Sequence, residues 1–304
     1  MSTSMSNILK TGCYSIILGD KYYEGYFPKK ENKLLKVTKI MSNHSEIRHL
    51  SKIRSIKEYE KYYSIPDEEI TILLNNSEFY KKLIQLVIKD NMTIFTGNLH
   101  CMYIDFAGTM DIIDSINELN ELNYSTVWTN IKSILDFSKH IMLGLKFLHE
   151  NKICHLDIKP ENIMINFNGK TNNFKIIDFG FCSEEPFNDY IIYFKGTPGY
   201  FPCHFDSINY IQPGVPKIEA NDMILINGII PMVGNRDLVY KIDSYCLGRV
   251  LYLIMHYYDN NIEIGCFDTE YRSRNKIKKI INLLLEKNIT ERVTITHLLD
   301  MNII

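Results

Sequence analysis

Apolar residues recur at three- and four-residue steps across residues 126–151, and this is the strongest helical pattern in the chain. The positions that form the apolar stripe are Ile131, Ile134, Leu135, Ile141, Met142, Leu145 and Leu148. A helix with a continuous apolar stripe is expected to pack at the centre of a core. The same spacing predicts shorter helices at residues 46–53, 77–88, 275–285 and 294–299.

Shorter runs of apolar or alternating positions predict strands. Residues 8–18 predict two strands around a turn, and residues 33–37 alternate as a strand does. Residues 100–104 form an apolar strand that runs into a small-residue turn, and residues 175–177 predict another short, buried strand. The chain is therefore expected to mix strands and helices.

Composition excludes several classes of protein. With 304 residues, of which 45% are apolar, the chain can bury the core of one large domain or two small ones. The formal net charge of −2 gives no basic field that would favour nucleic acid or an anionic membrane. The longest apolar run, residues 223–233, is interrupted by Asn227, Gly228 and Pro231 and is too short to span a bilayer. The seven cysteines lack Cys-x-x-Cys spacing and no leader-like segment begins the chain, so a reducing intracellular compartment is expected.

One short loop, residues 155–162, gathers the side chains that phosphoryl transfer requires. Asp157 can accept the proton of a substrate hydroxyl, and Lys159 can neutralise charge on the migrating phosphoryl group. The carboxamide of Asn162 can hold a magnesium ion. Pro160 fixes one φ angle of the loop and so limits the arrangements of these side chains.

A second motif, Asp178-Phe179-Gly180, directly follows the strand predicted at residues 175–177. It places another carboxylate beside a glycine that is expected to let the backbone turn. An Asn- and Gly-rich segment at residues 166–173 separates it from the first loop, as in a hairpin. An Asp-x-Gly turn alone is more often just a turn. In this order and spacing, however, His155-Leu156-Asp157 and Asp178-Phe179-Gly180 resemble the motifs of the eukaryotic-type protein kinase family.

The resemblance extends over nearly the whole chain and implies an α+β, two-lobed fold. Residues 1–304 would form one protein kinase domain, with a β-rich lobe to about residue 105 and a helical lobe over about residues 106–304. Two stretches exceed the usual family connections and are expected to be insertions, at about residues 76–98 and 205–241. The heavy use of Ile, Asn, Lys and Tyr suggests an AT-rich genome, and the chain looks like kinases of large DNA viruses or protists.

The resemblance also implies which residues hold ATP. Gly12 is the one residue that matches the glycine-rich phosphate loop, although a register that uses Gly19 or Gly25, or an ordinary hairpin, is an alternative. Lys36 resembles the lysine that grips the α and β phosphates, and Glu46 would hold that lysine. Two other lysines are alternatives for the phosphate contact: Lys33 and Lys39. Two later glutamates are alternatives for its partner: Glu58 and Glu60.

Residues 100–108 resemble the strand and hinge that cradle adenine, with Ile104 as the gatekeeper. The backbone groups of Asp105 and Ala107 would meet the edge of the adenine ring, while apolar side chains sandwich its faces. Because backbone groups make these contacts, the identity of the side chains says little about whether the site prefers ATP to GTP.

Further motifs resemble those that, in the family, bind the protein substrate or support the catalytic loop. Residues 196–200 look like the loop beneath a peptide substrate, where Thr197 would contact Asp157 and Lys159. This loop and the Lys-Pro-Glu-Asn of the first loop resemble the serine/threonine branch, and Phe181 suggests serine over threonine. Residues 243–248 resemble the helix whose aspartate, here Asp243, anchors the catalytic loop, with a plain N-cap as the alternative.

Three positions depart from the family. Leu156 replaces an arginine that binds a phosphate on the activation loop, so switching through that contact should be absent. Cys203-His204 replaces a Pro-Glu whose glutamate would pair with Arg292, so that pair is expected to be lost or replaced. Neither Cys154-His155 nor Cys203-His204 has the ligand spacing of a zinc site.

The resemblance thus implies a serine/threonine protein kinase that transfers the γ-phosphoryl group of Mg-ATP to a protein hydroxyl. Asp157, Lys159 and Asn162 would be catalytic, and Asn162 with Asp178 would bind magnesium. The partner is expected to be a protein substrate, with no nucleic acid or membrane. The alternatives are a pseudokinase that binds nucleotide or acts as a scaffold, and a small-molecule kinase.

Overall fold

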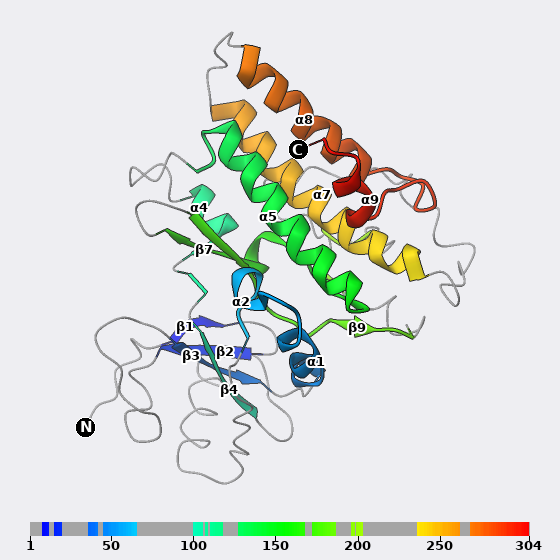
Figure 1. The fold of residues 1–304 in the computed structure, drawn as a ribbon. Helices are drawn as coiled ribbons and strands as arrows, with labels where there is room; N and C mark the ends of the chain where they lie inside the picture. Colours follow the sequence, from blue (N-terminus) through cyan, green and yellow to red (C-terminus); the bar gives the residue numbers. More distant parts are fainter. Residues whose placement is uncertain are drawn as a thin grey trace. The chain divides into compact units, whose positions relative to one another are not determined.

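The protein is a mixed α/β structure of small sheets and helices, seen in a computed structural model (Figure 1). The structure describes residues 8–11, 15–19, 36–41, 45–65, 100–105, 107–108, 110–117, 127–167, 172–186, 196–197, 199–202, 236–261 and 268–303. These residues fall into two compact units. One holds the described residues of Met1–Arg54 and Ser64–Phe106, and the other those of Ser55–Tyr63 and Ala107–Ile304.

The first unit is built on an antiparallel sheet with the strand order β1-β2-β3-β4. Its strands are β1 (Ile8–Thr11), β2 (Ser15–Gly19), β3 (Lys36–Met41) and β4 (His100–Asp105). The hairpin predicted at residues 8–18 and the strand predicted at residues 100–104 are confirmed. The strand predicted at residues 33–37 lies further along, because all six residues of β3 pair with β4, from Lys36 opposite Asp105 to Met41 opposite His100.

Helix α1 (Ser45–Arg54) confirms the helix predicted at residues 46–53 and buries Leu50 and Ile53. The segment after it, residues 55–63, belongs to the second unit, which the sequence pattern did not predict. It contains the short helix α2 (Tyr59–Tyr62). Tyr63 fixes this segment, because its hydroxyl donates to the backbone oxygen of Gly144 and its backbone bridges Ile176.

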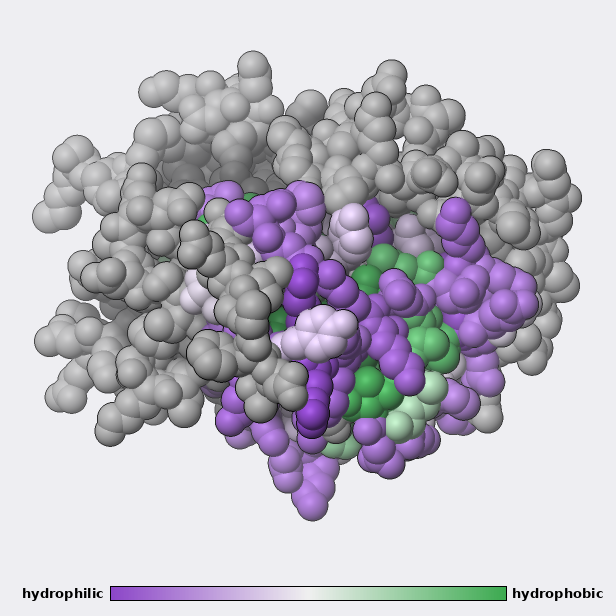
Figure 2. All heavy atoms as spheres, turned by 90° about the horizontal axis from the view of Figure 1, so that it is seen from above, coloured by the Kyte–Doolittle hydropathy of each residue, from purple (hydrophilic) through white to green (hydrophobic). Residues whose placement is uncertain are grey.

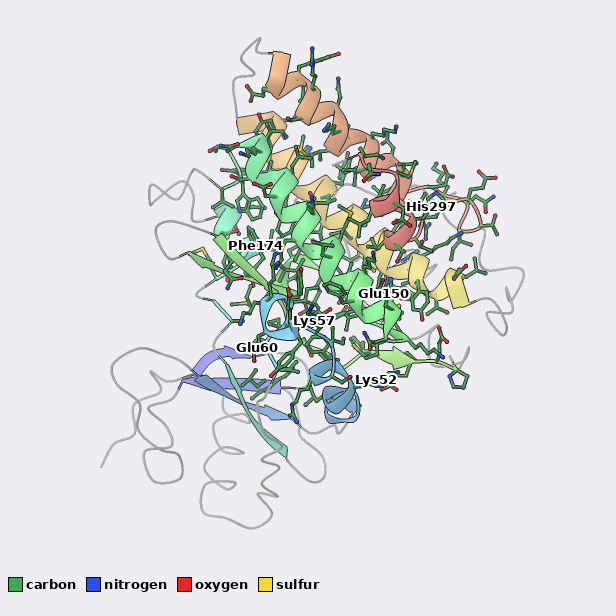
Figure 3. The ribbon with its side chains drawn as sticks, in the orientation of Figure 1. Lys52, Lys57, Glu60, Glu150, Phe174 and His297 are labelled. Atoms are coloured by element: carbon green, nitrogen blue, oxygen red, sulfur yellow. The ribbon has the colours of Figure 1, made fainter. Side chains whose placement is uncertain are left out.

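The core of the second unit surrounds helix α5 (Ile131–Glu150). The helix begins five residues after the predicted start because Asn130 caps it, accepting a 2.9 Å hydrogen bond from the backbone N–H of Lys132. Trp128 and Phe174 pack against this helix at Phe137, with ring centroids 5.2 and 4.9 Å away. Figure 3 labels Phe174 beside this helix. The indole N–H of Trp128 donates to Ser115 in α4 (Ile112–Asn117), so its polar edge is satisfied in the core.

Two small sheets flank the loop at residues 155–159. Strands β5 (Met110–Asp111), β7 (Ile163–Phe167) and β8 (Asn172–Ile176) form one sheet, and β6 (Ile153–Cys154) pairs with β9 (Ser183–Glu184). The antiparallel pairing of β7 with β8 confirms the hairpin predicted around residues 166–173. A single turn of 3₁₀ helix, η4 (Pro160–Asn162), leads from the loop into β7.

Helices α7 (Arg236–Asn261), α8 (Asp268–Leu284) and α9 (Ile295–Asp300) complete this unit (Figure 1). Helices α8 and α9 confirm the two helices predicted near the end of the chain. Helix α7 begins at Arg236, so it includes the last residues of the stretch 205–241 that was expected as an insertion. Asp243 lies inside α7, and the alternative that it is an N-cap is wrong.

Several predictions lie outside the described residues, namely the helix at residues 77–88, the insertion at residues 76–98 and most of the insertion at residues 205–241. Within the described part of the chain, no helix combines the length and the apolar character needed to cross a membrane. Seen from above, the described side chains are mainly hydrophilic, with a smaller group of hydrophobic ones among them (Figure 2).

Candidate active site

Asn162 fixes Asp157 at the centre of the loop. Its amide nitrogen Nδ2 donates a 2.8 Å hydrogen bond to the backbone oxygen of Asp157 and a 2.9 Å hydrogen bond to the carboxylate oxygen Oδ2. Both residues are only 4% exposed. Because Nδ2 is used in this way, the carboxamide oxygen of Asn162 is left to bind another group, such as a metal ion.

Thr197 joins Asp157 to Lys159. Its hydroxyl donates a 2.6 Å hydrogen bond to Oδ1 of Asp157 and accepts a 2.8 Å hydrogen bond from Nζ of Lys159. The ammonium group of Lys159 also lies 3.4 Å from Oδ2 of Asp157. These contacts confirm the prediction that Thr197 meets both residues. These contacts bring together the Asp157 carboxylate, which can accept a proton, the Lys159 ammonium group and the Thr197 hydroxyl.

The environment of Asp157 makes its carboxyl group more basic. Burial raises its pKa, while the positive charge of Lys159 and the hydrogen bond from Thr197 oppose that rise, and the net shift is upward. The charge of Asp178 adds to the rise, which places the two carboxyl groups within electrostatic reach of each other. A carboxylate with a raised pKa is a better proton acceptor, as a general base requires.

Asp243 holds the backbone at the start of the loop. Its carboxylate accepts 2.8 Å hydrogen bonds from the backbone N–H groups of His155 and Leu156. Leu156 has φ +65°, a left-handed conformation that costs a non-glycine residue about 1–2 kcal/mol. The anchoring role expected of Asp243 is therefore confirmed, because its hydrogen bonds hold a backbone that would otherwise relax.

Two side chains that the sequence did not identify also contact Asp243. His149 Nε2 lies 2.9 Å from Oδ2, and the Cys154 thiol donates to the same oxygen over 3.2 Å. Burial alone would raise the pKa of the Asp243 carboxyl, but the hydrogen bond and charge of His149, together with the charge and backbone N–H of His155, outweigh it, and the net shift is downward. No local pattern predicts the contact with His149, because 94 residues separate the pair.

His149, Cys154 and Asp243 also offer one potential metal ligand each, with ligand atoms within 4.8 Å of one another. Burial, followed by the charge of Asp243, raises the pKa of the Cys154 thiol well above its usual value. The thiol is thus held as a protonated donor rather than as the thiolate that zinc binds. The three residues therefore form a hydrogen-bonded anchor.

Asp178 departs from the conformation that we expected. The sequence assigned the turn to Gly180, but the positive φ of +65° belongs to Asp178 and Gly180 has none. Gly180 instead lets the Asp178 carboxylate lie close to the backbone. Its N–H faces Oδ1 of Asp178 at 3.4 Å, and a Cβ on residue 180 would lie 3.3 Å from that oxygen. The N–H of Ile177 donates to the backbone oxygen of Asn162, which ties the two motifs together.

Phe179 is buried between two aromatic side chains. Its ring lies 5.3 Å from the ring of His155 and 5.8 Å from the ring of Tyr63. His155 in turn reaches the backbone oxygen of Ile177 through Nε2, at 3.2 Å. Packing and hydrogen bonding thus hold the second motif against the loop that contains Asp157.

The residues expected to bind ATP are described only in part. Ile104 is 9% and Ala107 is 8% exposed, and Asp105 pairs with Lys36 across β3 and β4. Gly12 lies outside the described residues, as do the side chains of Lys36 and Glu46. Two of the alternatives are described: Lys39 is buried at 6% exposure, whereas Glu58 and Glu60 are exposed.

Arg292, which lacks its expected glutamate in the sequence, is held by other groups. It lies over the ring of Tyr245, 4.6 Å from the centroid, and donates to the backbone oxygens of Glu286 and Lys241. The expected partner position, Cys203-His204, lies outside the described residues. Arg292 is thus buried among an aromatic ring and carbonyl oxygens.

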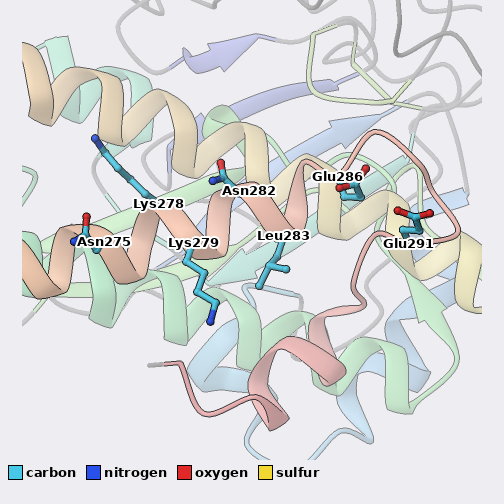
Figure 4. Close-up of a pocket in the computed structure, with 7 residues that line it drawn as sticks. All are labelled: Asn275, Lys278, Lys279, Asn282, Leu283, Glu286 and Glu291. Carbon is cyan, nitrogen blue, oxygen red and sulfur yellow. The ribbon is translucent and has the colours of Figure 1, made fainter.

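An open hollow of about 600 Å³ lies apart from this loop, on α8 and the turn after it (Figure 4). The side chains that line it are Asn275, Lys278, Lys279, Asn282, Leu283, Glu286 and Glu291. None of the residues expected to act in phosphoryl transfer lines this hollow. The candidate active site is therefore the group around Asp157.

Comparison with known proteins adds an independent result. Residues 36–205, or 170 of the 304 residues, match the family model of the protein kinase domain. A titin homolog of Caenorhabditis elegans is 28% identical over 170 residues, which are 55% of this chain. Myosin light chain kinase 3 of Danio rerio is 30% identical over 130 residues, or 41% of the chain. A death-associated protein kinase of Caenorhabditis elegans is 32% identical over 139 residues, or 45% of the chain.

The matched stretches are small parts of these relatives. They cover 1% of the titin homolog, 16% of the myosin light chain kinase and 9% of the death-associated protein kinase. All three are animal proteins, so they give no support to the viral or protist origin that the composition suggested.

Proposed function

The chain belongs to the protein kinase domain family and is a distant homologue of serine/threonine kinases, and we propose that it is an active serine/threonine protein kinase. The reaction is transfer of the γ-phosphoryl group of Mg-ATP to a hydroxyl of a protein substrate. We also propose that the chain has the two-lobed kinase fold, with a β-rich lobe to about residue 105 and a helical lobe after it.

The observation that carries the proposal is the hydrogen-bonded group of Asp157, Lys159, Asn162 and Thr197. Asp157 accepts the proton of the substrate hydroxyl, and Lys159 stabilises the negative charge of the phosphoryl group in flight. In this reaction most of the rate enhancement comes from positioning and charge neutralisation. Hydrogen bonds that fix Asp157 from two sides are what such a mechanism needs.

Magnesium fits the oxygen atoms at this site. Asn162 supplies a carboxamide oxygen and Asp178 a carboxylate, which are the hard donors that the ion prefers. The ion would neutralise charge on the phosphates of ATP. Lys36, held by Glu46, is proposed to position those phosphates, with Gly12 in the phosphate loop. The backbone of Asp105 and Ala107, with Ile104 beside them, is proposed to receive adenine.

The substrate class follows from two motifs. The sequence of residues 196–200 favours a protein hydroxyl over a small molecule. Together with the Lys-Pro-Glu-Asn of the loop it favours the serine/threonine branch, and Phe181 favours serine over threonine. A peptide library with either serine or threonine at the acceptor position tests this preference. Equal transfer to both would remove the serine preference, and transfer only to small alcohols would favour a small-molecule kinase.

The central test is transfer of label from γ-labelled ATP to a generic basic protein, with magnesium and with a chelator. We expect transfer with magnesium, its loss with the chelator, and a fall of about a hundredfold or more in Asp157→Asn. The single glycine matched in the phosphate loop favours a pseudokinase as the second candidate. Binding of ATP without transfer, or equal transfer by wild type and Asp157→Asn, would support that candidate instead.

A further inference from the structure

Arg249 of α7 contacts the segment that contains Thr197. Its side chain is 8% exposed, and its Nε donates a 2.9 Å hydrogen bond to the backbone oxygen of Gly199. Its guanidinium also lies over the ring of Tyr252, 5.9 Å from the centroid. A guanidinium stays charged, and its burial is costly unless its donors are used in a fixed geometry. Arg249 is therefore placed to hold the Gly199 carbonyl.

The carbonyl that Arg249 holds belongs to a closed turn, residues 196–197 and 199–202, which we call the Gly199 turn. The backbone N–H groups of Tyr200 and Phe201 both donate to the backbone oxygen of Thr197, at 3.1 and 3.0 Å. Gly199 has φ +89°, and a Cβ there would meet nothing within 4 Å. Glycine is therefore needed for the left-handed backbone that directs this carbonyl, and not for space.

The turn is also packed at its other end. Gly196 has φ +103°, and a Cβ there would lie 2.4 Å from the ring of Phe201. The close contact between Gly196 and Phe201, with the two hydrogen bonds to Thr197, makes the turn a compact unit. Because the turn is tied to the Thr197 backbone, we expect a shift of the Gly199 carbonyl to move Thr197 as well.

We propose that Arg249 is a positioning residue for phosphoryl transfer. By holding the Gly199 carbonyl it fixes the Gly199 turn, and the turn keeps the Thr197 hydroxyl on Asp157. Arg249 touches neither substrate nor nucleotide in this scheme and acts only through Thr197. The inference rests on the proposed kinase function.

This role would compensate for the missing glutamate that, in the family, pairs with the arginine matched by Arg292. The sequence has Cys203-His204 where the glutamate that would pair with Arg292 is expected. Arg292 is occupied by Tyr245 and by backbone carbonyls. Arg249 supplies an anchor from α7 to the Gly199 turn, through a backbone carbonyl in place of a carboxylate.

The first test measures hydrogen exchange, which does not depend on activity. In Arg249→Lys, which keeps the charge but loses Nε, we expect the amides of Tyr200 and Phe201 to exchange about tenfold faster. Amides of α5 and α8 should be unchanged, which shows that the variant is folded. The matched control is Arg274→Lys, because Arg274 also donates through Nε, to Asp259, far from the turn in sequence. Unchanged exchange of the Gly199 turn in Arg249→Lys would overturn the proposal.

The second test is a double-mutant cycle with Thr197→Val. Arg249→Lys alone should lower kcat/KM for a peptide by about tenfold and leave KM for ATP within about twofold. In the Thr197→Val background the same change should cost less than about twofold, because Arg249 acts through Thr197. Full additivity would overturn the proposal. If wild type transfers no label, the proposed function fails, while the exchange result still decides whether Arg249 holds the Gly199 turn.

Discussion

The hydroxyl of Thr197 donates a 2.6 Å hydrogen bond to Asp157, 40 residues earlier in the chain, and accepts one from Lys159. Valine has nearly the same shape but neither donates nor accepts. We therefore expect Thr197→Val to lower kcat/KM for a peptide by about tenfold to a hundredfold, measured by steady-state kinetics. Thr197→Ser keeps the hydroxyl and should stay within about threefold of wild type. A fully active Thr197→Val would contradict the role of this hydrogen bond.

Asp157→Asn should lower transfer by about a hundredfold or more without weakening the fold. A carboxyl whose folded-state pKa is raised binds its proton more tightly when folded, so stability falls as pH rises from 3.8 through the folded-state value. At neutral pH the ionised, buried Asp157 therefore opposes folding, and the amide does not. We expect an equal or higher Tm for Asp157→Asn at pH 7, and a smaller difference near pH 4. A clear loss of stability at pH 7 would show that the charge of Asp157 stabilises the fold.

Asp243→Asn should have the opposite effect on stability. The folded-state pKa of Asp243 is lowered, so its contribution is present above pH 3.8 and is lost as pH falls through the lower folded-state value. Removing this buried charge leaves its donors without a proper partner and should cost about 3 kcal/mol or more of unfolding free energy. Urea unfolding at pH 7 measures the loss.

The matched control for that variant is Asp259→Asn. Asp259 pairs with Arg274 and Lys278 at the surface, with 27% of its side chain exposed. We expect this substitution to cost about 1 kcal/mol or less. Equal losses in the two variants would mean that burial of Asp243 among the loop N–H groups adds nothing.

Lys36 and Lys39 can be separated by mutation. They are three positions apart in β3, and because successive strand positions alternate between faces, we expect the two lysines to serve different roles. We expect Lys36→Met to raise KM for ATP by about tenfold or more with little change in Tm. Lys39→Met should change Tm instead, because the Lys39 side chain is buried. The reverse pattern would assign the phosphates to Lys39.

Local patterns in the sequence predicted much of this structure. The apolar stripe predicted α5, and the compact motifs predicted the loop around Asp157 and the hairpin before Asp178, because these features depend on residues a few positions apart. The contacts of Thr197 were predicted from the resemblance to the kinase family, since 40 residues separate it from Asp157. The start of α7 was missed because its first turns precede the recognisable motif at Asp243.

Other features depend on packing between distant residues, which no local pattern contains. The attachment of residues 55–63 to the second unit depends on Tyr63 reaching Gly144. The hydrogen bonds of His149 with Asp243 and of Arg249 with Gly199 depend on how α5 and α7 pack, so no local pattern predicts them. The left-handed backbone at Asp178 was assigned to Gly180, because glycine is the usual residue at such a position.

Trp128 gives the protein a built-in optical probe. It is the only tryptophan among the 304 residues, it is fully buried, and it belongs to the unit that holds the candidate active site. Intrinsic fluorescence excited at the indole band therefore reports on the melting of this unit alone. Every variant of this unit discussed above can be checked for folding without a label, whereas the Lys36 and Lys39 variants lie in the other unit and need a different probe.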